Sequence, residues 1–460
     1  MYEPLFHYGP KDGGASEIQP ALATAWSLKD PVHPTITIRQ GVTFHDGSKL
    51  TPEVVAWNIE RMVKDKDSNQ KATLTDIKSV KVLDDTKVQL TLTGPSPSIF
   101  IRLSDSAGVG TGIVSEDAYT KNGADWFAMH EAGTGPFQLK SFTQDQDTQV
   151  VAYKGYWDKG TDGKPLPYLD GIDYQMLRDT GAAVSGLKAG TIDVVGDPDS
   201  SMLKSVASTS SIEVLKLTSQ NGYPGTFGFN YKKAPFNDKL VRQAAQTAMD
   251  RATISKVVNP DYSEPAQVPL WNDSMPGWDD SLDHTYDFDV DKAKSLMAKA
   301  GIKTPVNATL IYQSREPDAT IAQLWKQQFA KIGIELKTVP LEETVFEQRL
   351  VSGDFDMATW GWGTPLTPDF ASVYWGPGGA QNWVDYDNPA VTKPMDEAAK
   401  TVDAAKQATL YKEMLTQLMD DATYGVIVRQ KSLTLQRTVV QGTQEYWGFL
   451  DFDHAYKTGK

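Results

Sequence analysis

The sequence contains no cysteine, and only six of its 460 residues are histidine. Without cysteine the chain cannot form disulfides, thiolate zinc sites, iron–sulfur clusters or cysteine nucleophiles. The histidines are scattered and no two are four residues apart, so a transition-metal site would need ligands from several distant segments. We therefore expect no bound metal and no cofactor.

Long apolar runs are missing as well. No stretch of about 18 apolar residues occurs, and Met1 is followed by Tyr-Glu-Pro-Leu rather than by a basic and apolar leader. We expect no membrane helix in this sequence. If the protein is exported or lipid-anchored, the segment that carries that address lies upstream of Met1 or has been removed.

Positive charge is scarce relative to negative charge. The chain has 45 Lys and Arg against 59 Asp and Glu, which gives a formal net charge of −14. Such a chain repels phosphate backbones and anionic lipid surfaces, so we expect no nucleic-acid partner. The length predicts several domains, because single cores stop growing at roughly 250 to 300 residues.

Motifs of known catalytic chemistry are also absent: no G-x-S-x-G, H-E-x-x-H or complete P-loop occurs. Asp287, Asp289 and Asp291 resemble the opening of a calcium loop, but Lys292 and Ala298 stand where that loop needs glycine and glutamate. Acidic groups favour the positive end of a helix, so we interpret these aspartates as helix-start residues. We expect no enzyme, although composition alone leaves a hydrolase with paired carboxylates open.

Hydrophobic periodicity predicts the order of the elements. Alternation with period two predicts strands over 35–39 and 87–92, and a helical stripe begins at Asp238. The change of period places a domain boundary near residues 230 to 238. Further predicted elements are helices that end at Gly301 and Gly333, a strand over 334–339, a helix over 403–421 and a strand that begins at Val426.

Aromatic residues are plentiful, with 12 Trp and 18 Tyr. Trp360 and Trp362 alternate with glycines, which let a backbone approach a ligand closely while the indoles offer flat apolar walls. The same tryptophans could instead fill a core. Their position on a segment rich in glycine and proline favours a binding site.

Several segments, taken in order, carry a resemblance. The most specific is Arg39–Ser48, which reads RQGVTFHDGS. The others are Tyr2–Leu5, Gly133–Phe137, Tyr156–Trp157, Leu187–Asp193, Phe236–Arg251, Gly353–Met357, Gly361–Trp362 and Tyr386–Pro389. Together they resemble the family 5 solute-binding proteins, a family that includes dipeptide-, oligopeptide- and nickel-binding proteins.

The resemblance implies an α/β fold of the two-lobed periplasmic-binding-protein type (type II, cluster C), with an extra β-rich subdomain in the first lobe. The implied divisions are 8–134 for the β-rich subdomain, 1–7 with 135–231 and 432–460 for the rest of the first lobe, and 232–431 for the second lobe. The family normally carries a few tens of residues before its Y-E-x-L segment. We therefore expect a first lobe without its N-terminal strand.

The resemblance also implies a function. The chain would be the substrate-binding component of an ABC importer, a monomer outside the cytoplasm that in its full form is lipid-anchored. It would capture peptides, most plausibly oligopeptides, and deliver them to the membrane permease after hinge closure. An oligosaccharide ligand is the alternative within binding proteins, because stacked tryptophans also suit sugars.

Candidate ligand-binding residues follow from the resemblance. Arg315 occupies the position that receives a ligand carboxylate, although it could instead pair on the surface with Glu316 or Asp318. The family's amine-binding aspartate has no direct counterpart, since its usual position holds Thr364 or Pro365. The full candidate set is Tyr2, Tyr223, Asn230, Arg315, Trp360, Trp362, Thr364, Asp369 and Trp383.

Overall fold

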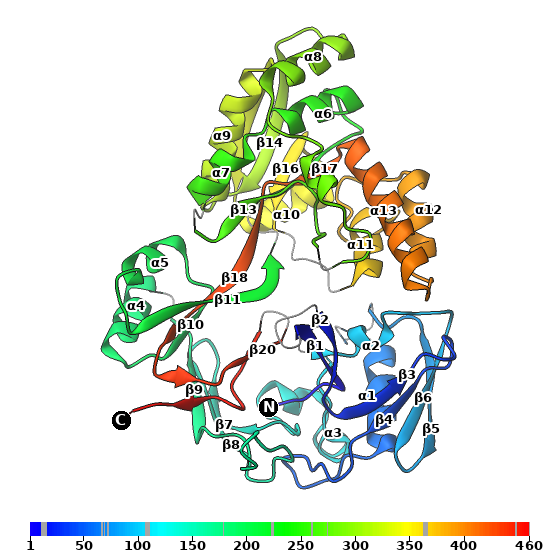
Figure 1. Cartoon of the computed structure of the whole chain (residues 1–460), viewed down its shortest axis with the longest axis vertical. Coiled ribbons are helices and arrows are strands. Elements are labelled where there is room, and N and C mark those ends of the chain that lie inside the picture. The colour runs from blue at the N-terminus through cyan, green and yellow to red at the C-terminus, as the bar shows by residue number, and fades with distance from the viewer. Residues whose placement is uncertain are drawn as a thin grey trace. The chain divides into compact units, whose positions relative to one another are not determined.

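The computed structural model divides the chain into two compact units. It describes residues 1–460 except 11–15, 66–67, 69, 71–72, 106–110, 178, 222–224, 259–260, 274, 362–366, 447–448 and 460. Unit 1 comprises Met1–Thr218 and Ser432–Lys460, and unit 2 comprises Ser219–Lys431. Unit 2 is thus one continuous segment, whereas unit 1 is completed by the last residues of the chain (Figure 1).

Unit 1 contains an antiparallel sheet of order β3-β4-β6-β5. Its strands are β3 (Ala23–Ser27), β4 (Thr35–Ile38), β5 (Ile77–Asp84) and β6 (Lys87–Leu92), and α1 (Pro52–Lys64) packs against β5 and β6. Every second residue of β4 and β6 is buried, as expected for strands with one covered face. The two strands predicted from period-two alternation are confirmed.

The R-x-G-V-x-F-H-D-G segment starts directly after strand β4 and has a structural role. His45 Nδ1 donates to Glu131 Oε2 at 2.6 Å, and its Nε2 donates to the carbonyl oxygen of Gly135 at 2.8 Å. Both ring nitrogens thus lie within hydrogen-bond distance of oxygen acceptors. The side chains of His45 and Glu131 are only 4% and 5% exposed, so the motif forms a buried ion pair that joins two distant loops.

The remaining elements of unit 1 form smaller sheets and short helices. The strand β18 (Val428–Arg437) crosses from unit 2 into unit 1. It lies between β10 and β11 in one sheet, and its first residues, which still belong to unit 2, pair with β13. The other elements are β1 (Phe6–Pro10), β2 (Ser16–Pro20), α2 (Ile99–Arg102), α3 (Glu116–Asn122), β7 (Phe137–Thr143), β8 (Asp147–Ala152), β9 (Gly171–Gln175), α4 (Thr180–Ala189), β10 (Val194–Gly196), α5 (Ser200–Val206), β11 (Ile212–Asn221), β19 (Val440–Gln441), β20 (Gln444–Tyr446), β21 (Phe449–Asp451) and β22 (Tyr456–Lys457).

Unit 2 contains a five-stranded sheet of order β15-β14-β16-β12-β17. The strands are β12 (Thr226–Phe229), β14 (Val306–Gln313), β15 (Ile334–Leu341), β16 (Met357–Trp360) and β17 (Tyr424–Val426). β14 is parallel to β15 and β16, while β12 is antiparallel to β16 and β17. β12 belongs to this sheet, and the compact unit 2 begins at Ser219. The predicted start of the second lobe at residue 232 stays a prediction. The division of the first lobe at residue 134 stays a prediction.

Helices cover both faces of the unit 2 sheet. Alternate residues of β14 point to opposite sides: Leu310 and Tyr312 lie in an apolar cluster with α9, and Ile311 lies in a second cluster with α13. The helices are α6 (Lys239–Thr247), α7 (Arg251–Val258), α8 (Val290–Ala300), α9 (Asp318–Ala330), α10 (Glu343–Val351), α11 (Ala371–Trp375), α12 (Pro389–Ala398) and α13 (Ala404–Asp421), with β13 at Ser263–Pro265.

The helix termini of unit 2 confirm the local predictions. The side chain of Asp289 accepts a hydrogen bond from the backbone N–H of Lys292 and caps α8, and Gly301 ends that helix in the left-handed region at φ +67°. The helix-start interpretation of the aspartate cluster is therefore correct. Among the helices that the structure describes, none is long and apolar enough to cross a membrane.

Candidate functional site

Two of the predicted ligand-binding residues lie at the carboxyl ends of the parallel strands in the unit 2 sheet. The parallel strands β14, β15 and β16 end at one edge of the sheet, and in open α/β sheets ligands bind beyond the carboxyl ends of the strands. Arg315 follows the end of β14, and Trp360 is the last residue of β16. The sheet topology therefore brings these two residues to the same edge.

Arg315 forms an ion pair with a buried carboxylate, and its side chain is partly exposed to solvent. Its Nε donates to Asp318 Oδ2 at 3.2 Å, and Asp318, the first residue of α9, is only 1% exposed. The side chain of Arg315 is 46% exposed. The pairing with Asp318 that the sequence left open as an alternative is thus present, and it fixes the arginine while part of the guanidinium still faces solvent.

The two described tryptophans of the predicted set differ in their burial. Trp360 is 3% exposed and its ring lies 5.1 Å from that of Trp383 in an edge-on arrangement. Gly228 in β12 makes this packing possible, since a Cβ there would lie 2.6 Å from the Trp360 ring. Trp383 is half-buried at the margin of the same cluster. Trp360 is therefore a core residue that supports Trp383, and Trp383 is the more accessible of the two indoles.

The other predicted residues of unit 2 are dispersed. Asp369 lies half-buried in the 3-10 turn Pro368–Phe370. Asn230 lies at the opposite edge of the sheet, where its side-chain amide donates to the carbonyl oxygens of Gly353 and Phe355 at 3.1 Å each. Because this amide is used to join two loops, Asn230 does not belong with Arg315. Tyr223, Trp362 and Thr364 lie outside the described residues.

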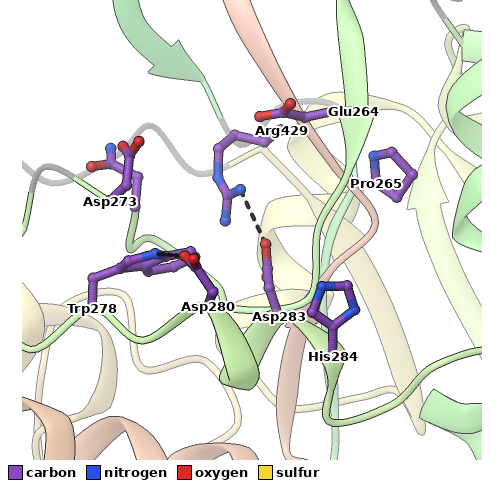
Figure 2. Close-up of a pocket in the computed structure, with 9 residues that line it drawn as sticks. Glu264, Pro265, Asp273, Trp278, Asp280, Asp283, His284 and Arg429 are labelled. Atoms are coloured by element: carbon purple, nitrogen blue, oxygen red, sulfur yellow. Dashed lines mark hydrogen bonds and ion pairs between the residues drawn. The ribbon is translucent and has the colours of Figure 1, made fainter.

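A hollow of about 310 Å³ in unit 2 was not predicted from the sequence (Figure 2). It lies beside the paired strands β13 and β18, and charged groups and one indole surround it. The residues that line it are Glu264, Pro265, Asn272, Asp273, Trp278, Asp280, Asp283, His284 and Arg429.

The floor of this hollow is an ion pair that is largely, but not fully, buried. Arg429 Nη1 donates to Asp283 Oδ2 at 3.2 Å, and the guanidinium carbon lies 5.1 Å from the centre of the Trp278 ring. The other oxygen of Asp283 accepts from the backbone N–H groups of Gln267 and Val268 at 2.8 and 2.9 Å. Figure 2 shows Arg429 reaching towards Asp283, with Trp278 and Asp280 on the same side of the space. The arrangement is preorganised, because each buried charge already has its partners.

Unit 1 has a hollow of its own, of about 390 Å³, and Tyr2 is one of its lining residues. Four carboxylates line it together with His7: Glu3, Asp105, Asp451 and Asp453. Burial raises the pKa of Asp453 to about 6, and the nearby charge of Asp451 acts in the same direction. Tyr2 thus lies in unit 1 among acidic groups, whereas the other predicted residues that the structure describes belong to unit 2.

A comparison with protein families decides the assignment. The model described as "Bacterial extracellular solute-binding proteins, family 5 Middle" matches residues 17–384, which is most of the chain. The chain belongs to this family. The family does not consist of catalysts, so this solute-binding protein is not an enzyme, and its general role is to bind the substrate of an ABC importer outside the cytoplasm.

Relatives of this solute-binding protein bind different small molecules. A glutathione-binding protein from Pectobacterium atrosepticum is 26% identical over 442 residues, which cover 92% of this chain and 82% of the relative. The dipeptide-binding protein of Escherichia coli is 26% identical over 463 residues, with coverage of 93% and 84%. Identity at this level leaves the ligand open.

A solved structure confirms the predicted fold class. The periplasmic binding protein DppA from Helicobacter pylori, in complex with the peptide STSA, superposes with a TM-score of 0.78 and covers 99% of this chain and 92% of that chain, at 24% identity. The α/β fold of the two-lobed binding proteins, predicted from the motif series, is therefore correct for the solute-binding protein described here.

Replacing Asp453 with asparagine should stabilise unit 1 at neutral and alkaline pH. The raised pKa means that the folded state binds a proton more readily than the unfolded state, so wild-type stability falls as pH rises from about 4 to above 6. Asparagine keeps the acceptor that the backbone N–H of His454 uses but carries no charge. We expect a gain on the order of 2 kcal/mol at pH 8 that shrinks towards pH 4.

Thermal unfolding at pH 5 and pH 8 measures this effect. The matched control is Asp85→Asn, an exposed carboxylate in the same unit, for which stability should change little at either pH. An Asp453→Asn gain that is equal at pH 5 and pH 8 would show that Asp453 does not titrate in this range.

Proposed function

We propose that this solute-binding protein captures peptides of several residues outside the cell membrane and delivers them to the permease of its ABC importer. The observation that carries the proposal is Arg315, whose side chain is nearly half exposed beyond the carboxyl end of β14 in unit 2. A guanidinium pairs with a carboxylate through two parallel hydrogen bonds, so Arg315 suits the terminal carboxylate of a peptide. The buried Asp318 restricts the arginine beforehand, which lowers the entropy lost on binding.

The names of the relatives support the same ligand class. One is named for glutathione, which is a tripeptide, one is named for a dipeptide, and the Helicobacter pylori structure holds the peptide STSA. A carboxylate is common to all of these ligands. A site in which a single arginine recognises that carboxylate would serve peptides of different length.

Broad specificity is part of the proposal. Trp383 offers a half-buried indole beside Trp360, and flat apolar walls accept side chains of varied shape. Asp369, half-buried in its turn, is the carboxylate of the predicted set that could meet the amino end. We propose that the main chain and the carboxylate of the peptide are recognised, while most side chains are tolerated.

Delivery would follow from a change of conformation. We propose that the ligand binds the open protein first and that hinge rotation then populates a closed state, which the permease recognises. Small-angle X-ray scattering should show a smaller radius of gyration when a bound peptide is present. An unchanged radius with saturating peptide would contradict closure while leaving the peptide assignment intact.

Replacing Arg315 with alanine tests the peptide assignment. We expect peptide affinity to fall by about 10- to 150-fold, since a hydrogen bond to a charged group contributes about 1.5–3 kcal/mol. Titration calorimetry with tri- to pentapeptides measures the loss. Peptides with an amidated carboxyl end should bind wild type as weakly as free peptides bind the variant, and amidation should have no further effect on the variant.

Two controls separate ligand recognition from folding. Arg349→Ala removes another arginine of unit 2, one that pairs with Asp354 at 2.9 Å, and should leave peptide affinity unchanged. Arg315→Lys retains the charge opposite Asp318 but loses the planar fork, so it should fold normally and still bind peptide more weakly. Binding of oligosaccharides and of no peptide would assign the protein to the sugar-binding alternative.

A further inference from the structure

The hollow beside β13 and β18 has an excess of negative charge. Glu264, Asp273, Asp280 and Asp283 line it against the single guanidinium of Arg429, which leaves three net negative charges with His284 neutral. Only Asp283 is paired with that guanidinium. Within the part of the chain that the structure describes, no lysine or arginine pairs with Glu264, Asp273 or Asp280.

The hollow has a base of fixed contacts, and the carboxylates of Glu264, Asp273 and Asp280 lie exposed around it. Its ion pair is largely buried, and Arg429 is also held by the carbonyl oxygen of Trp271 at 3.3 Å. The indole N–H of Trp278 donates to Asp280 Oδ1 at 2.6 Å, which fixes one of the outer carboxylates. These contacts hold the walls in place without a ligand, and a preorganised site loses little entropy on binding.

The size and walls of the cavity define what fits. About 310 Å³ is the lower end of the range for small-molecule sites and accommodates one long side chain rather than a whole peptide. The Trp278 ring and Pro265 supply apolar surface for an aliphatic stem. The exposed carboxylates of Glu264 and Asp273 can then meet a charged end, as long basic side chains bury their stems and keep their charges near water or acids.

We propose that this cavity binds a basic side chain of the ligand, an ammonium or guanidinium group, and that the protein therefore prefers peptides that contain lysine or arginine. The proposal rests on the proposed function for the peptide nature of the ligand. A carboxylate side chain would be repelled by the net charge of the cavity. A neutral side chain of similar length would contact the indole but would gain nothing from the carboxylates.

The test compares three pentapeptides that differ only at the central position among alanines: lysine, norleucine or glutamate. Titration calorimetry of the full chain should show about tenfold tighter binding of the lysine peptide than of the norleucine peptide, with the glutamate peptide weakest. In the double variant Glu264→Gln and Asp273→Asn, the lysine and norleucine peptides should bind within about threefold of each other. The charge-matched control is Glu335→Gln with Glu347→Gln, two exposed residues of unit 2 outside the cavity, and it should retain the preference.

Nα-acetyl-lysine methylamide serves as a second probe, because it has the basic side chain but no terminal carboxylate. Equal binding of the lysine and norleucine peptides to wild type, or a lysine preference that survives in the double variant, would overturn the inference while peptide binding stands. Binding of the acetyl-lysine probe in a manner that depends on Glu264 and Asp273, without binding of any peptide, would support the cavity and reject the peptide function. Binding of neither probe would reject the inference.

Discussion

Replacing His45 with alanine is expected to lower the free energy of unfolding of unit 1 by about 3–5 kcal/mol, which would make it one of the most damaging single substitutions in the protein. The side chains of His45 and Glu131 are both almost completely buried, and the substitution leaves the buried carboxylate without its hydrogen-bonded partner. The carbonyl oxygen of Gly135 would lose its donor at the same time. Urea denaturation of the full chain, followed by tryptophan fluorescence, measures the loss.

The exposed pair His33–Asp30 provides the matched control. His33 Nδ1 donates to Asp30 at 2.9 Å, a distance similar to that in the buried pair, but both side chains are exposed to solvent. His33→Ala should therefore change stability by less than about 1 kcal/mol. If His33→Ala and His45→Ala destabilise equally, burial is not what makes the His45 pair important.

The buried pair also predicts how stability depends on pH. Burial by itself would raise the pKa of Glu131, but hydrogen bonds from His45 and from the backbone N–H of Gly133 outweigh it and hold the pKa below its ordinary value of 4.5. A lowered pKa means that the carboxylate contributes stability above pH 4.5 and that this contribution is lost as the pH falls below it. His45→Ala should flatten that acid transition, which stability curves between pH 3 and pH 7 would show.

Replacing Trp360 with alanine should cost about 3–5 kcal/mol in unit 2, because the substitution removes a large buried side chain and leaves a cavity. Its ring fills the space above Gly228 and packs edge-on against Trp383. Trp383→Ala should destabilise the protein less than Trp360→Ala, since the Trp383 indole is only half-buried. Relative to that smaller loss of stability, Trp383→Ala should cause the larger loss of peptide affinity. Denaturation and calorimetry on both variants separate the two roles.

The conservative variant Trp360→Phe keeps an apolar ring in the cluster and should recover much of the lost stability. Loss of ligand binding in Trp360→Phe, with stability close to that of wild type, would show that the Trp360 ring contacts ligand directly. In that case the interpretation of Trp360 as a core residue would be wrong.

Local patterns made most of the fold predictable. Alternation along 87–92 follows from a sheet with one covered face, and Asp289 and Gly301 are signals that act within a few residues of the helix they bound. The motif series also identified the family, because its members share order and spacing along nearly the whole chain. The compact unit 2 begins before the change of period near residue 230, since β12 has only four residues, too few for a periodic signal.

The site was less predictable because its contacts join distant segments. Asp283 and Arg429 are 146 residues apart, and nothing near either residue indicates that β13 and β18 pair and bring them together. Trp360 is buried because Gly228 on the neighbouring strand β12 leaves room for its ring. Hydrophobic periodicity within one segment does not reveal such a contact between strands. Asn230 was a plausible polar candidate, but its amide is used by backbone carbonyls that only the folded loop supplies.

The position of β18 in the chain has a consequence for synthesis on the ribosome. This strand lies between β10 and β11, yet the part of it that pairs with β10 follows the whole of unit 2, Ser219–Lys431. At about 5–20 residues per second, roughly 10 to 40 seconds pass between the emergence of β11 and that of its neighbour. Unit 2 is continuous and can fold during that interval, so we expect the sheet of unit 1 to close last, with its edges exposed to chaperones and proteases until then.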